Sequence, residues 1–274
     1  MDVTNVSCAR VGRRAALATV ARDGTARVWD AESSAKVIEV HADPRAATRA
    51  HSVAVSPDGT HVCLGCNDGT VGVVRVGVGG GGPGVRGGVV PGVSGPVRHV
   101  AAHPGRNAGA VVCVEFVAPP LLAPRGFALT PLLSVASDGS IALTATHETS
   151  SSSGGGGGGG GDADIPTEVV AAVARDASGA GAVGGGGAPH HNAHRHDPVV
   201  AAAVERETNP ALVAVARAGG LQVYAVDTVE HKAALRATYT PHAERFMALA
   251  STEGELATTG PRVKGALVAW SAAN

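Results

Sequence analysis

The chain has 274 residues, of which 22 are basic and 23 acidic, giving a net charge of −1 at pH 7. This length allows one large β domain or two small domains, and the balanced charge argues against a strongly basic nucleic-acid binder. No apolar run reaches the roughly 18 to 20 residues of a membrane-spanning helix, so no membrane insertion is expected.

The first predicted elements are two short strands within residues 17–30, joined by a turn at Asp23-Gly24. Further Asp-Gly pairs occur at 58–59, 68–69 and 138–139. Such a pair between two apolar runs predicts a β-hairpin, because glycine tolerates positive φ and aspartate caps the turn. The spacing therefore predicts an all-β fold. An α-rich fold is the alternative, since residues 15–21 and 199–206 are rich in alanine, but the turns and the many valines argue against it.

Three low-complexity stretches interrupt the pattern, near residues 77–95, 149–164 and 178–196. Glycine-rich segments bury too little surface to offset the entropy of ordering them. We expect them to be loop insertions in a single domain that covers residues 1–274, because the strand pattern resumes after each.

A repeat emerges when the apolar runs are aligned on their turns. The copies are residues 17–30, 63–74, 133–143, 212–227 and 256–270. The first reads LATVARDGTARVWD, the second lies within VAVSPDGTHVCLGCNDGTVGVVRV, and the third begins LLSVASDGS. These motifs resemble the WD-repeat family of β-propellers, whose repeats each form a four-stranded antiparallel blade.

The resemblance implies a β-propeller of about five blades, the last without its fourth strand, and hence an incomplete or divergent ring. It places the first strands of the blades near Val3, Ser52, Val111, Val199 and Phe246. It places the fourth strands near 35–40, 96–101, 168–174 and 233–238.

The resemblance also implies a structural hydrogen-bond network that links a loop His, a strand Ser or Thr, a turn Asp and a strand Trp. The residues at these places are Thr19, Asp23, Trp29, His41, Asp68, His103, Ser134, Asp138, His242, Thr258 and Trp270. No repeat has all four residues. In the second repeat Leu64 stands at the Ser/Thr place and Val74 at the Trp place, and in the third repeat Thr144 stands at the Trp place. The Trp29 ring is expected to pack between neighbouring blades, with its N–H bonded to a partner such as Thr19.

Motifs that could carry chemistry are weak. Residues 77–82 match G-x-G-x-x-G, but the Pro-Gly sequence that follows does not open a helix. Cys63 and Cys66 have the C-x-x-C spacing of a zinc site or a redox pair, but the chain has no second pair of cysteines to complete a zinc site. Both also fall in a predicted strand, where residues three apart point to opposite faces. Four histidines between 190 and 196 lie in a Gly/Ala-rich insert that nothing pre-organises. We therefore expect no catalytic residue, no cofactor and no metal site.

The expected function is a non-enzymatic protein–protein interaction scaffold with other proteins as partners. Two alternatives stay open: a segment of a ciliary or centriolar WD-repeat protein, and an enzyme on a propeller frame with an unrecognised active site. Four cysteines are too few for a disulfide scaffold of this length, which favours reduced thiols and a cytoplasmic or nuclear location, with a cytoskeletal or ciliary one as an option.

Overall fold

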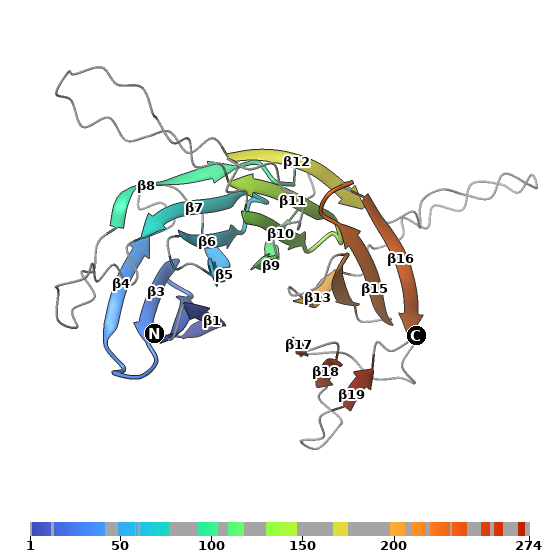
Figure 1. The fold of residues 1–274 in the computed structure, drawn as a ribbon, viewed down its shortest axis with the longest axis horizontal. Coiled ribbons are helices and arrows are strands. Elements are labelled where there is room, and N and C mark those ends of the chain that lie inside the picture. Colours follow the sequence, from blue (N-terminus) through green and yellow to red (C-terminus); the bar gives the residue numbers. More distant parts are fainter. Residues whose placement is uncertain are drawn as a thin grey trace, which may run out of the picture.

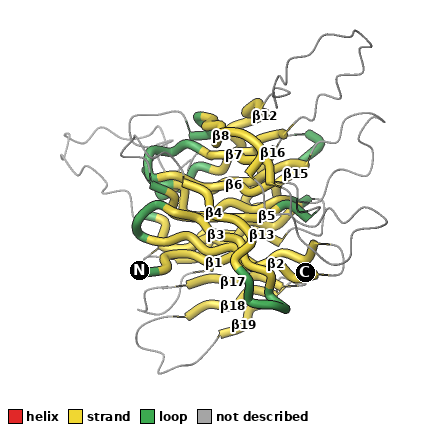
Figure 2. Tube along the Cα trace, turned by 90° about the vertical axis from the view of Figure 1, so that its left-hand side faces the viewer, coloured by secondary structure: helices red, strands yellow, loops and turns green. Residues whose placement is uncertain are grey.

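The computed structural model describes residues 2–11, 14–41, 49–57, 59, 61–76, 93–103, 109–117, 130–146, 167–174, 198–205, 210–217, 220–230, 232–239, 248–252, 255–259 and 268–271. Every regular element among them is a strand (Figure 2). The alanine-rich segments that could have been helical lie in strands, because their backbone groups pair with neighbouring strands. The predicted all-β class is confirmed.

Consecutive strands pair antiparallel into five separate sheets, here called blades 1 to 5. Blade 1 has β1 (Val3–Val11), β2 (Arg14–Ala21), β3 (Thr25–Asp30) and β4 (Lys36–His41). Blade 2 has β5 (Ala50–Val55), β6 (His61–Cys66), β7 (Val71–Val76) and β8 (Val93–Val100). Blade 3 has β9 (Val111–Phe116), β10 (Thr130–Ala136), β11 (Ile141–Thr146) and β12 (Thr167–Ala174). Blade 4 has β13 (Val199–Glu205), β14 (Ala211–Arg217), β15 (Gly220–Asp227) and β16 (Lys232–Tyr239), and blade 5 has β17 (Ala248–Thr252), β18 (Glu255–Thr259) and β19 (Val268–Ser271).

The blades lie side by side around an open arc (Figure 1). The first strand of each blade is on the inner side of the arc, and the fourth strands of blades 1 to 4 are on the outer side. Both sets of strands start within a few residues of the places expected from the repeat. The arrangement is that of β-propeller blades packed radially.

One predicted boundary is wrong. The loop insertion expected at 77–95 ends earlier, because Val93 and Ser94 already pair with Val76 and Arg75 at the start of β8. An outer strand needs only backbone hydrogen bonds on one side, so it tolerates Gly95 and Pro96 where a central strand would not. Residues 77–92 and the other two predicted inserts lie outside the described residues.

The turns between the second and third strands repeat one geometry. Gly24, Gly69 and Gly139 have φ of 84°, 81° and 89°, which a residue with a side chain adopts only at a cost. In each turn the glycine N–H donates to the carbonyl three residues earlier, at 2.9, 3.4 and 2.9 Å. The Asp-Gly signal in the sequence thus predicts the turns at these three places. The aspartate of the fourth pair, Asp58, lies outside the described residues.

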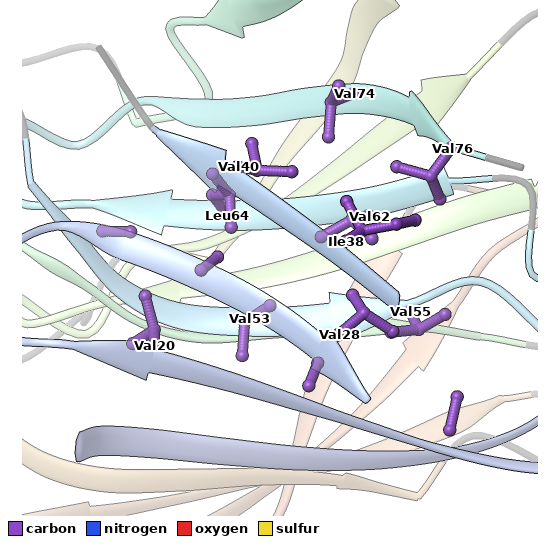
Figure 3. Close-up of a cluster of buried hydrophobic side chains, with 14 of the residues drawn as sticks. Val20, Val28, Ile38, Val40, Val53, Val55, Val62, Leu64, Val74 and Val76 are labelled. Carbon is purple, nitrogen blue, oxygen red and sulfur yellow. The ribbon is translucent and has the colours of Figure 1, made fainter. Parts of the chain in front are cut away.

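The three largest core clusters lie between the blades, and a smaller one is made up of residues of blade 4 alone. Figure 3 shows valines and other aliphatic side chains of blades 1 and 2 meeting face to face, among them Val20, Val28, Val53 and Leu64. A second cluster joins blade 2 to blade 3, and a third joins blade 3 to blade 4. Blades 2 and 3 are therefore covered on both faces, which explains why all six residues of β6 are buried.

Gly65 on β6 has no side chain, and this leaves room for a hydrogen bond that joins blade 2 to blade 3. It lies opposite Ser52, whose hydroxyl donates to the Val111 carbonyl of blade 3 at 3.0 Å. A Cβ at position 65 would overlap Ser52 Oγ and lie 2.7 Å from Val111 Cγ1. We expect Gly65→Ala to lower the free energy of unfolding by about 1 to 3 kcal/mol, the usual range for overpacking. Chemical denaturation measures this, and an unchanged midpoint would contradict the close packing.

Candidate functional site

The most complete polar network lies in blade 3. Ser140 follows the Asp138-Gly139 turn and gives both its N–H (2.8 Å) and its hydroxyl (2.6 Å) to Asp138 Oδ1. His103, in the segment between blades 2 and 3, lies with Nδ1 2.8 Å from Ser140 Oγ and Nε2 2.9 Å from Ser134 Oγ. His103, Ser134 and Asp138, which the resemblance pointed to, thus come together around a residue it did not include, Ser140.

The hydrogen-bond pattern assigns the protons in this network. Because the Ser140 hydroxyl donates to the carboxylate, His103 Nδ1 must carry a proton and donate to Ser140 Oγ. Nε2 then accepts from the Ser134 hydroxyl, whose second acceptor, the Ala142 carbonyl, is farther away at 3.4 Å. A neutral imidazole with one proton satisfies every member. Burial lowers the pKa of His103 to about 4, which keeps this neutral form at physiological pH, although the nearby Asp138 charge acts in the opposite direction.

The order Ser–His–Ser–Asp resembles the proton relay of a serine nucleophile, so its accessibility decides what it can do. A nucleophile must be reached by substrate, and its developing oxyanion needs donors beside it. Ser134 is 0% exposed and His103 is 6% exposed. The network can hold the segment between blades 2 and 3 against blade 3, and the Ser134 hydroxyl at its end is out of reach of a substrate. The backbone N–H of His103 also donates to the Gly69 carbonyl of blade 2 at 3.2 Å, so this segment connects blade 2 to blade 3.

Blades 1 and 2 repeat the turn part of this network. Thr25 donates its N–H and hydroxyl to Asp23 Oδ1 at 2.9 and 2.6 Å, and Thr70 does the same to Asp68 at 3.0 and 2.6 Å. The hydrogen bond from the Thr25 hydroxyl is the main reason that the pKa of Asp23 lies below its ordinary value. The hydroxyl residue directly after each of these Asp-Gly pairs is the signal in the sequence that points to this hydrogen bond.

In blade 1 the indole N–H of Trp29 donates to Thr19 Oγ1 at 3.0 Å. The expectation that the ring packs between two blades is wrong. Trp29 follows Val28, which belongs to the core shared with blade 2, so its side chain points to the opposite face of the sheet, where it stays half-buried. The sequence showed the strand position of Trp29 but not which face of blade 1 would be covered.

His41 does not join the network of blade 2. It is exposed at the end of β4, with Nε2 3.6 Å from Glu39 Oε1 of its own strand. The histidine beside the turn of blade 2 is His99 on β8, whose Nδ1 lies 3.4 Å from Thr70 Oγ1. The repeat alignment could not find this residue, because β8 pairs with β7 only after an insert of variable length.

Thr144 fills the place where blade 1 has Trp29, and it is fully buried. Its hydroxyl has no hydrogen-bond partner among the described residues. A buried unsatisfied hydroxyl costs about 1 to 3 kcal/mol, and valine has nearly the same shape without it. We expect Thr144→Val to raise the free energy of unfolding by about 1 kcal/mol, measured by thermal and chemical denaturation. Thr144→Ser keeps the hydroxyl and is expected to destabilise, so stabilisation by serine would contradict this interpretation.

Blade 4 departs most from the repeat. Arg217 pairs with Gly220, so two residues, neither an aspartate, separate β14 from β15, against three or four between the second and third strands of blades 1 to 3. Tyr224 stands at the Trp place, is 8% exposed, and donates its hydroxyl to Gln222 Oε1 at 3.2 Å. Arg217 Nη2 donates to the Asp138 carbonyl of blade 3 at 3.2 Å. The arginine thus fastens blade 4 to the turn of its neighbour.

The remaining predicted residues are less fully described. His242 and the histidines between 190 and 196 lie outside the described residues. Thr258 is on β18 opposite Val268, and Trp270 is on β19 opposite Leu256. Their side chains are not described.

Three of the four cysteines, Cys63, Cys66 and Cys113, lie in environments that hold the thiol protonated. Burial raises the pKa of Cys63 well above its ordinary value, and it raises that of Cys66 to about 11 and that of Cys113 to about 12. A thiol held protonated in this way is a poor nucleophile and a poor metal ligand. Across the described ranges, no group of three or more His, Cys, Asp or Glu side chains could hold a metal ion. A search of the same ranges for a helix able to cross a membrane finds none.

Comparisons with known proteins agree on the architecture. No family model matches the sequence, and no curated protein matches it. Among solved structures, the chain is similar to the WD40 domain of SCAP from fission yeast, with a TM-score of 0.55 and 13% identity over 95% of this chain. It spans 51% of that longer chain. With its four-stranded antiparallel blades and inter-blade cores, the chain has the WD40 β-propeller fold in a divergent form.

Proposed function

We propose that the chain is a non-enzymatic scaffold that binds other proteins on the end of the blades carrying the three Asp-Gly turns. This end, here called the turn rim, comprises residues 22–24, 67–69 and 137–139 together with Arg49. A WD40-type fold supports this proposal, since such folds commonly present loops of several blades on one rigid frame.

The observation that carries the proposal is the set of hydrogen bonds that hold the turn rim in place, within blades 2 and 3 and between blades 3 and 4. Asn67 Oδ1 accepts from the Arg49 N–H at 2.8 Å, and the Asn67 N–H donates back to the Arg49 carbonyl at 3.0 Å. Ser137 bonds to Ala110, and Val199 of blade 4 donates to the Ser137 carbonyl at 2.9 Å. A docking surface of this kind loses little conformational entropy on binding. Arg22, Arg49 and Asp68 are exposed on it.

Direct binding of a captured partner tests the proposal. The full chain serves as bait, and each captured protein is purified and titrated against it. We expect the double variant Arg22→Glu, Arg49→Glu to weaken binding at least tenfold without changing the melting temperature. Lys232→Glu, an equally exposed cation at the opposite end of the blades, is the matched control and is expected to leave affinity unchanged. Equal affinity of all three chains would remove the turn rim as the docking surface.

The cellular location is part of the proposal: a cytoplasmic or nuclear protein, with a cytoskeletal or ciliary position as the alternative. Imaging of the tagged full chain distinguishes these. An enzymatic role would need a titratable cluster open to substrate, whereas the strongly shifted groups in the described part of the chain, His103 and three cysteines, owe their shifts to burial.

A further inference from the structure

Arg49 lies on the turn rim between the turn of blade 1 and the turn of blade 2. Its backbone is fixed by Asn67 of blade 2, which accepts from the Arg49 N–H at 2.8 Å and donates to the Arg49 carbonyl at 3.0 Å. Its side-chain stem packs over Gly24 of blade 1, where an added Cβ would lie 3.7 to 3.9 Å from Cα, Cβ and Cγ of Arg49. The arginine is therefore held in place by contacts with both turns.

The guanidinium of Arg49 has no partner of opposite charge in the described part of the chain. Arg49 is exposed, and its only hydrogen bonds with other described residues are the two backbone bonds to Asn67. Asp23, the carboxylate next to Gly24, is held by its own turn, where Oδ1 accepts the N–H and the hydroxyl of Thr25. The positive charge of Arg49 is thus available to a bound partner.

Arg22, the other exposed arginine of the turn rim, differs in this respect. Its Nη1 lies 4.0 Å from Asp2 Oδ2, and the two side chains are 78% and 79% exposed. Such a loose surface pair contributes little to stability, but its carboxylate offsets the positive charge of Arg22 locally. Of the two arginines, Arg49 is therefore the one whose charge is unmatched among the described residues.

Carboxylates flank Arg49 in the two turns that it contacts. Asp23 precedes Gly24 in the turn of blade 1, Asp68 follows Asn67 in the turn of blade 2, and both aspartates are exposed. The charges along this part of the turn rim therefore run negative, positive, negative. A phosphate group carries nearly two negative charges at pH 7, so both aspartates repel it more strongly than they repel a carboxylate, which carries one. The complement of this pattern is a single carboxylate between two cations.

We propose that Arg49 binds a carboxylate of the partner protein, on a segment in which a Glu or Asp stands between two Lys or Arg. This partner chemistry rests on the proposed function, in which the turn rim is the docking surface. A planar guanidinium binds a carboxylate through two parallel N–H···O hydrogen bonds, and the ordered stem of Arg49 reduces the conformational entropy lost on binding. In an extended segment the side chains on one side recur every second residue, about 6.6 Å apart, which gives the pattern cation-x-acid-x-cation.

Titration of a captured partner against single variants tests the role of Arg49. Arg49→Gln is expected to weaken binding about fivefold or more, and to reduce its sensitivity to salt because a charge pair is lost. Arg49→Lys keeps the charge but loses the planar fork of donors, and is expected to weaken binding about threefold. Arg22→Gln is the matched control and is expected to change the affinity less than about twofold.

Two outcomes of this titration are distinguishable. If the double variant Arg22→Glu, Arg49→Glu binds weakly while Arg49→Gln binds like the natural chain, Arg49 does not hold a carboxylate, and the turn rim remains the docking surface. If both bind like the natural chain, the turn rim is not the docking surface.

Short synthetic peptides test the same contact without a captured partner. The probe is the dye-labelled peptide Lys-Ser-Glu-Ser-Lys, and the matched control has Gln in place of Glu. By fluorescence anisotropy at low salt, we expect the natural chain to bind the glutamate peptide at least about threefold more tightly than the control, and Arg49→Glu to reverse this order. A third peptide, with phosphoserine at the central position, is expected to bind no more tightly than the glutamate peptide. Tighter binding of the phosphoserine peptide, or an unchanged order of affinities in Arg49→Glu, would overturn the carboxylate assignment.

Discussion

Phe116→Ala is expected to lower the free energy of unfolding by about 3 to 5 kcal/mol, one of the two largest effects of any single change considered. Phe116 ends β9, is 1% exposed, and lies opposite Leu132 in the cluster between blades 2 and 3. Its neighbours there include Val73 and Ala142, which are too small and too stiff to fill the space that the ring leaves.

Equilibrium denaturation in urea measures this effect, which is a large part of the 5 to 15 kcal/mol of a typical domain. Leu235→Ala is the control, because that side chain is 52% exposed and its truncation removes little buried area. We expect the control to change stability by less than about 1 kcal/mol. If both substitutions had the same effect, Phe116 would not be part of a packed inter-blade core.

Acid is expected to destabilise the protein through His103. Its pKa is about 4 in the folded protein against 6.5 in a free chain. Above pH 6.5 both states are neutral at this residue. As the pH falls from 6.5 to 4, the unfolded chain gains a proton that the folded protein does not accept, so the free energy of unfolding decreases. At about 1.4 kcal/mol per pKa unit the total loss is about 3 kcal/mol, complete below pH 4.

The comparison of the natural chain with His103→Gln isolates this contribution. The variant loses hydrogen bonds and is less stable at pH 7, but its stability is expected to depend about 3 kcal/mol less on pH between 6.5 and 4. His51→Gln, at an exposed histidine of β5, is the control for the exchange of a histidine for glutamine itself. If the free energy of unfolding changed with pH in the same way for the natural chain and His103→Gln, His103 would not be held neutral by burial.

Local signals in the sequence sufficed for the strands and the turns. The Asp-Gly pairs predicted the three described turns because positive φ and the aspartate cap are decided within a few residues. The repeat predicts the strands of each blade, and the start of β8 differs from the prediction because an outer strand leaves a weaker pattern. The grouping of His103, Ser134 and Asp138 followed from the repeat. The repeat does not include the bridging residue Ser140, although a hydroxyl residue follows each of the three Asp-Gly turns.

The sequence by itself determined the repeat, the hairpins and therefore the blades, because these depend on contacts between residues close along the chain. Only the tertiary structure decided which face of each blade is covered, since this depends on the neighbouring blade rather than on the strand's own residues. Trp29 and Thr144 occupy the same place in two repeats, yet Trp29 is half exposed and Thr144 is fully buried. The difference arises because blade 3 has a neighbour on that side, whereas the arc of blades is open beside blade 1.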